Sequence, residues 1–146
     1  MIPPFEPSGN LPHGIHWATW EDVIERFNTG ERRRRLLAGL ALAIADLRAA
    51  GCQTIYIDGS FVTGKDRPGD FDACWDTEGI DWDRLDPALT TFDAGRRVQK
   101  SRYSGELFPA DAIADIYGTR FLDFFQTDKY SRTPKGIVAI DLREPT

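Results

Sequence analysis

The fold is decided by residues 54–60, TIYIDGS, together with residues 70–76, DFDACWD, and the nine residues between them. Residues 54–57 are β-branched or aromatic, which predicts a buried strand. Gly64, Pro68 and Gly69 mark residues 61–69 as a loop. Residues 70–76 alternate in polarity, with Asp70 and Asp72 on one face and apolar side chains on the other, so they predict a second strand.

The flanking sequence predicts helices over residues 19–27, 30–50 and 110–125, and strands over residues 106–108 and 136–142. Four prolines within residues 1–18 predict an irregular N-terminal segment. At 146 residues, one domain over 1–146 is the natural size. We expect an α+β fold (a mixed α/β sheet) of about four strands with helices packed against it.

Composition narrows the classes of function. The net charge of −5 disfavours wholesale non-specific binding to nucleic acid. The N-terminus lacks the basic and apolar regions of a signal peptide, and no apolar stretch approaches membrane-spanning length. Cys52 and Cys74 belong to no ligand cluster and are expected to be free thiols. The sequence therefore predicts a cytoplasmic protein with no membrane association.

Asp70 and Asp72 form the chemical centre of the predicted unit. On a strand they point to the same face, where two carboxylates repel each other unless they share a cation. Mg²⁺, or Mn²⁺ in its place, suits such a pair when substrate phosphates complete its shell. Gly59 leaves room for close backbone approach, and Ser60 offers a hydroxyl and an N–H to phosphate oxygens. The competing interpretation is a hairpin whose turn end happens to be acidic.

This pattern of strand, Gly-Ser, spacer and Asp-hydrophobic-Asp resembles the nucleotidyltransferase superfamily, the fold of DNA polymerase beta and of the minimal nucleotidyltransferases. It looks closest to a small, poorly characterised bacterial group of nucleotidyltransferase-like domains, and the resemblance covers residues 54–76. It implies a third carboxylate on a following strand, as metal ligand or general base. Glu106 leads because a short apolar strand flanks it, whereas Asp111 and Asp141 are alternatives and Asp123 is expected on a helix surface.

Basic side chains near this unit allow two interpretations. Lys65 and Arg67 lie in the loop between its halves, where they contact a nucleotide or belong to a solvated loop tip. The block from Arg32 to Arg35 wraps around a helix, so its members cannot all pack inward. Because positive charge opposes the dipole at a helix N-terminus, the block favours a partner such as RNA, phosphate or an acidic protein.

Three hypotheses of function follow. The first is a metal-dependent enzyme that moves a nucleoside monophosphate from a nucleoside triphosphate to a hydroxyl of protein, RNA or a small molecule. The resemblance places such domains in bacterial toxin–antitoxin modules, with a partner protein from the same operon. The second is a nucleotidyltransferase-like binding module without turnover, acting in a complex with a partner protein. The third is a purely structural α+β protein.

Overall fold

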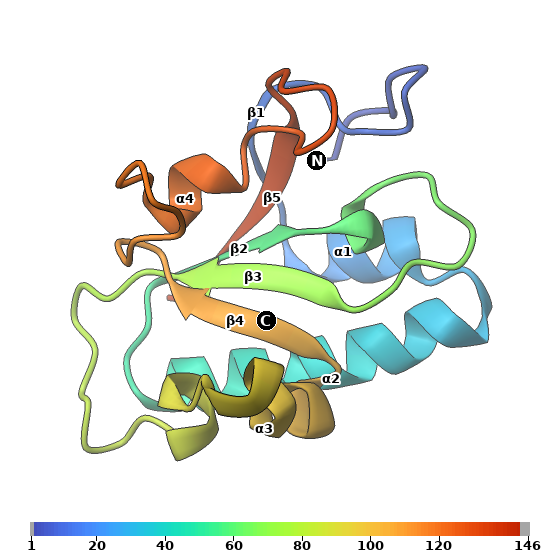
Figure 1. The fold of residues 1–146 in the computed structure, drawn as a ribbon. Coiled ribbons are helices and arrows are strands. Elements are labelled where there is room, and N and C mark those ends of the chain that lie inside the picture. The colour runs from blue at the N-terminus through green and yellow to red at the C-terminus, as the bar shows by residue number, and fades with distance from the viewer. Residues whose placement is uncertain (1, 144–146) are drawn as a thin grey trace.

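The computed structural model describes residues 2–143 and contains a five-stranded mixed sheet (Figure 1). Its strands are β1 (Gly14–Trp17), β2 (Thr54–Asp58), β3 (Phe71–Trp75), β4 (Gly105–Pro109) and β5 (Gly136–Asp141), in the spatial order β1-β5-β2-β3-β4. β2 runs antiparallel to β3 and β5, whereas β1 and β5, and β3 and β4, are parallel pairs. The predicted α+β fold is confirmed.

The sheet has five strands rather than about four because Gly14–Trp17, expected to be irregular, forms β1. This strand pairs in parallel with β5, in the register Gly14 to Gly136 through Trp17 to Ala139. Gly136 permits the approach, since a Cβ there would lie 2.0 Å from the Pro12 carbonyl oxygen. The strand depends on a partner more than 100 residues away, which local composition does not reveal.

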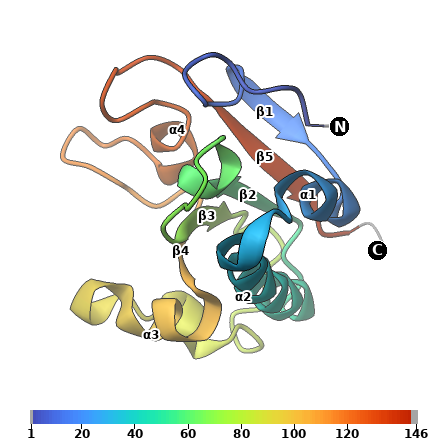
Figure 2. The same ribbon diagram turned by 90° about the vertical axis from the view of Figure 1, so that its right-hand side faces the viewer.

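The helices are α1 (Trp20–Phe27), α2 (Gly30–Ala49), α3 (Asp93–Tyr103) and the short α4 (Phe121–Phe124). Thr19 and Asp22 form a capping box that fixes the start of α1. α1 and α2 lie on one side of the sheet and α4 on the other (Figure 2). None of the helices in the described part of the chain is long and apolar enough to span a membrane.

Strand alternation divides the buried side chains into two clusters. Ile55 and Ile57 of β2 and Phe71 of β3 face α1 and α2, in one cluster with Leu36 and Leu40 of α2. A smaller cluster on the opposite face contains Cys74 and Ile137, covered by residues around α4. The second face is therefore only partly covered, and polar groups on it are left accessible.

The helix expected over residues 110–125 is confined to Phe121–Phe124. Residues 115–117 form a turn, in which the Asp115 carboxylate accepts hydrogen bonds from the N–H groups of Tyr117 and Thr119, each at 3.0 Å. An aspartate that bonds nearby backbone donors in this way competes with helix formation. Gly118 then takes a left-handed conformation, with φ +81°, which ends any helical path.

Candidate functional site

Three carboxylates lie side by side on the partly covered face of the sheet. The register places Asp58 of β2 opposite Asp72 of β3, and Asp72 beside Glu106 of β4. Neighbouring strands bring such side chains within about 5 Å of each other at Cβ. We call Asp58, Asp72 and Glu106 the carboxylate row. Two of its members were predicted from the sequence, whereas Asp58 was expected only as the end of a strand.

The Gly59-Ser60 turn lies directly beside this row. Gly59 has φ +86°, and a Cβ on it would lie 3.1 Å from both the amide nitrogen and the Oδ2 of Asp72. A side chain at this position would therefore press on the central carboxylate. Ser60 Oγ accepts a hydrogen bond from the Gly69 N–H at 3.1 Å, and Thr63 Oγ1 donates to the Ser60 carbonyl at 2.7 Å. These bonds hold the turn in one conformation.

Arg33 of α2 anchors the same turn from beneath. Its guanidinium donates to the carbonyl oxygens of Phe61, Thr63 and Lys65 at 2.5, 2.8 and 2.6 Å. The residue is 4% exposed, and burial lowers its pKa. Arg33 thus packs inward as a structural clamp, so this member of the basic block is not free to meet an external partner. Its target carbonyls lie about 30 residues along the chain, which the sequence did not indicate.

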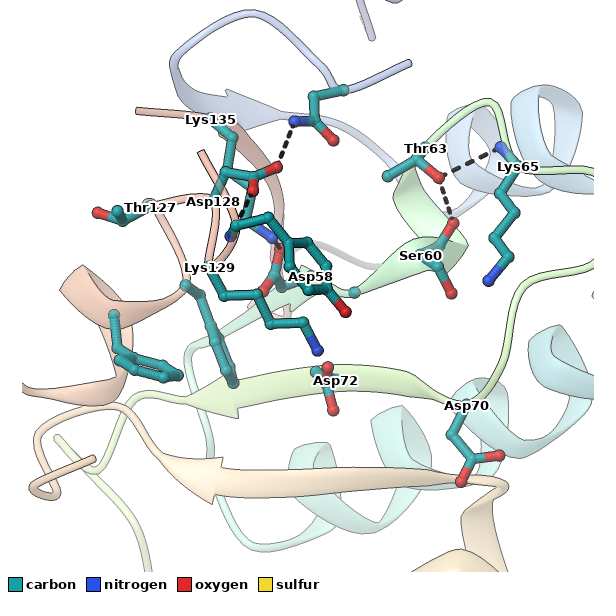
Figure 3. A pocket seen from close by; sticks show the side chains of 15 residues that line it. Asp58, Ser60, Thr63, Lys65, Asp70, Asp72, Thr127, Asp128, Lys129 and Lys135 are labelled. Carbon is teal, nitrogen blue, oxygen red and sulfur yellow. Dashed lines mark hydrogen bonds and ion pairs between the residues drawn. The ribbon is translucent and has the colours of Figure 1, made fainter. Parts of the chain in front are cut away.

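Of the other predicted nucleotide-binding and metal-binding residues, Lys65 and Asp70 line the cavity and Arg67 does not. Lys65 lines the cavity beside the turn, whereas Arg67 is exposed and is not among the residues that line it. Because β3 begins at Phe71, Asp70 lies outside the strand and its pleat. Asp70 lines the cavity edge, 3.6 Å from Arg32, and points away from Asp72 (Figure 3). The acids next to Asp72 in register are Asp58 and Glu106 rather than Asp70.

The row is electrostatically strained. Burial, then the negative charges of Asp58 and Glu106, raise the pKa of Asp72 to about 7. Burial also raises the pKa of Asp58, and this outweighs the opposing effect of Lys135, whose Nζ lies 2.7 Å from Asp58 Oδ1. Clustered acids with raised pKa values are a feature of sites that bind a cation or transfer a proton.

Glu106 is the candidate third carboxylate that the fold brings to the row. Its two oxygens pair with Arg96 at 3.3 Å and Lys100 at 3.1 Å, both on α3. Asp111 lies beyond the C-terminal end of β4, away from Glu106. Asp141 is paired in register with Thr54, at the other end of β2 from Asp58. Asp123 is exposed on α4, as expected.

No group of three metal-ligand side chains converges within residues 2–143. The donor chemistry nevertheless fits a hard divalent cation, because the row offers carboxylate oxygens and its central member carries a charge that its surroundings do not fully compensate. Asp72 and Glu106, adjacent in register, are the residues that would hold the ion.

The cavity beside the row has a volume of about 550 Å³, within the range of small-molecule sites. One wall is the Gly59-Ser60 turn and the other is the segment between α4 and β5 (Figure 3). That segment contributes Asp128, Lys129 and Lys135, none of which sequence reasoning selected. The one available signal was the position of Lys135 directly before the predicted last strand, which places it at an end of the sheet.

Comparison with curated proteins and with solved structures gives no match for the chain. One protein-family model does match it, over residues 3–141, which is nearly the whole sequence. On this match, the chain belongs to the family of unknown function DUF6932.

Proposed function

We propose that the protein is a nucleotidyltransferase-type enzyme that moves a nucleoside monophosphate from a nucleoside triphosphate to a hydroxyl group, with Mg²⁺ or Mn²⁺ as cofactor. The observation that carries the proposal is the position of Asp72, next to the Gly59-Ser60 turn on one side and adjacent in register to Glu106 on the other. The turn and Asp72 line one cavity, and Glu106 lies beside Asp72 on the neighbouring strand. The acceptor class is protein, RNA or a small molecule.

The chain's own residues would divide the work as follows. Ser60 and the backbone of the turn hold the phosphates, and Arg33 keeps that turn in place. The cation, held by Asp72 and Glu106, would supply charge neutralisation of the phosphates. The acceptor oxygen forms a bond to the α-phosphorus while the bond from that phosphorus to the oxygen bridging to the β-phosphate breaks, and pyrophosphate leaves. A carboxylate of the row accepts the acceptor's proton.

Asp72 has the electrostatics for this role. Its raised pKa reflects a charge that burial and two neighbouring acids disfavour. A nearby cation stabilises such a carboxylate more than it stabilises a solvated one, because less water screens the interaction between the two charges. Its position beside the turn, where a Cβ on Gly59 would lie only 3.1 Å from its Oδ2, also puts it next to any phosphate that the turn holds.

A second function, nucleotide binding without turnover in a complex with a partner protein, is favoured by one observation. Glu106 is already engaged by Arg96 and Lys100, so it is not available to a cation until those ion pairs open. A domain of this kind would act as one member of a cytoplasmic toxin–antitoxin pair encoded in one operon. The two functions share the cavity and differ in whether Glu106 is released.

Calorimetry with ATP, GTP, CTP and UTP, each with Mg²⁺, tests nucleotide binding and gives the base preference. Incubation with α-labelled nucleotide, cell RNA and lysate protein then tests transfer. Asp72→Asn should abolish transfer, and Glu106→Gln should abolish transfer while leaving nucleotide binding within a few-fold. Asp83→Asn, an exposed acid on the loop after β3, is the matched control. Label transfer that survives Asp72→Asn would show that the row is not the site of the chemistry.

A further inference from the structure

The cavity wall opposite the Gly59-Ser60 turn is a loop held in place by its own hydrogen bonds. We call residues 126–135 the lysine loop. Its ends are joined by backbone hydrogen bonds from Asp128 N to Thr133 O at 2.8 Å and from Lys135 N to Gln126 O at 2.9 Å. Between them, the Asp128 carboxylate accepts bonds from the N–H groups of Tyr130 and Ser131.

Asp128 also fixes the lysine loop to the rest of the molecule. Its Oδ2 accepts a hydrogen bond from the Asn10 amide at 2.9 Å, which ties the loop to the N-terminal segment. These bonds lower the pKa of Asp128 to about 2 because they favour its ionised form. Lys129, the next residue, is therefore presented from a fixed turn.

The two lysines of the loop have different surroundings. Lys135 is 16% exposed and pairs with Asp58, itself 6% exposed, at 2.7 Å. Removing it would leave a buried carboxylate without its counter-charge, so Lys135 is committed to the protein. Lys129 is exposed and has no ion pair within 4.0 Å among the described residues. Its amine points into the cavity toward Asp72, and its charge acts on that carboxylate (Figure 3).

We propose that Lys129 binds a phosphate group of the nucleotide, while Lys135 serves as the fixed counter-charge that keeps Asp58 in the protein's own ion pair. This inference rests on the proposed nucleotide site. It adds to that site a phosphate-binding residue that lies outside the Gly-Ser and Asp-Phe-Asp pattern. It also divides the carboxylate row: Asp58 stays in its ion pair with Lys135, whereas Asp72, and Glu106 once its ion pairs with Arg96 and Lys100 open, can bind a cation.

The charges of the cavity support a phosphate as the ligand. A triphosphate held at the Gly59-Ser60 turn would lie between Lys65 on one wall and Lys129 on the other. A lysine amine acts on phosphate oxygens as a point charge with three donors, and such charge-assisted bonds are about twice as strong as neutral ones. Because the Lys129 side chain is long and exposed, it reaches a phosphate without breaking a buried contact.

The test compares Mg²⁺-tripolyphosphate and Mg²⁺-ATP as ligands in calorimetry of the full chain. Lys129→Gln should weaken both by about tenfold or more, the lower end for one hydrogen bond to a charged group, and Lys129→Arg should restore most of the affinity. Arg132→Gln removes an equal charge from the same loop at a residue that does not line the cavity, so it should change affinity less than about twofold. Thermal unfolding verifies that each variant is folded.

The outcomes separate the two proposals. If Lys129→Gln binds both ligands as the unaltered chain does, Lys129 is only a counter-ion of Asp72, and this inference is overturned while the proposed function stands. If binding depends on Lys129 but no label reaches a hydroxyl, the inference holds and catalysis is refuted. If the unaltered chain binds neither ligand, both proposals are refuted.

Discussion

Replacing Asp72 with asparagine should stabilise the protein at neutral and alkaline pH when divalent cations are removed with EDTA. The carboxylate is held between Asp58 and Glu106, and these neighbours and burial raise its pKa from 3.8 to about 7. That change would cost the folded state about 4 kcal/mol once Asp72 is fully ionised. Partial exposure and side-chain relaxation reduce this, so we expect a gain of about 2 kcal/mol in the variant.

The pH dependence has a definite sign. A carboxyl whose pKa is higher in the folded than in the unfolded chain contributes stability that is complete below the unfolded pKa and is lost as pH rises through the folded pKa. For Asp72 the window runs from about pH 4 to about pH 7. The variant lacks this loss, so its advantage over the unaltered chain should grow across the window and remain constant above it.

Urea unfolding at about pH 4 and about pH 8 measures the effect. The difference in unfolding free energy between Asp72→Asn and the unaltered chain should be near zero at the lower pH and about 2 kcal/mol at the higher. Asp83→Asn, exposed and outside the row, should show no such growth. A variant that is less stable than the unaltered chain at about pH 8 would mean that Asp72 is held by favourable contacts, and the electrostatic argument for a cation site would fail.

Three further predictions concern the scaffold of the site. Arg33→Met should lower the free energy of unfolding by about 3 kcal/mol, because three loop carbonyls lose their donor, and urea unfolding with Arg35→Met as control tests this. Gly59→Ala should cost about 1–2 kcal/mol through its positive φ and its crowding of Asp72, and a nucleotide affinity equal to that of the unaltered chain would contradict the crowding. Asp128→Ala should speed hydrogen exchange in residues 127–135 above about pH 4. Because its pKa is lowered to about 2, this protection is lost as pH falls from about 4 to about 2, and a difference that persisted in more acidic solution would refute the assignment.

The central strands and the acids on them follow from local sequence. β-branched residues at 54–57 and alternating polarity at 70–76 specify β2 and β3, and the glycine in a left-handed turn specifies the bend after β2. Glu106 was identified because its short strand follows a basic segment, and the structure places it beside Asp72. The sequence alone was therefore enough to predict the fold class, the polar and apolar faces of β3, and two members of the carboxylate row.

The helix predicted over residues 110–125 shows where local signals mislead. The apolar residues at its end do pack in the smaller core cluster. Before them, Asp115 accepts hydrogen bonds from the backbone and Gly118 takes a positive φ, so this part of the chain turns. Composition suggested helix, whereas side-chain hydrogen bonds to the backbone decided otherwise.

By itself, the sequence determined the elements whose signals are periodic or lie within a turn, namely β2, β3, β5, α1 and α2, and it located the Gly59-Ser60 turn and Asp72. Only the tertiary structure decided the contacts between distant segments: β1 on β5, Arg33 on the turn, and Lys135 on Asp58, 77 residues apart. The physical reason is that periodicity and turn chemistry act over a few residues, whereas an ion pair or a strand pairing depends on where the whole chain brings its partner. The cavity wall that carries Lys129 and Lys135 depends on such contacts between distant segments, so the sequence alone did not reveal it.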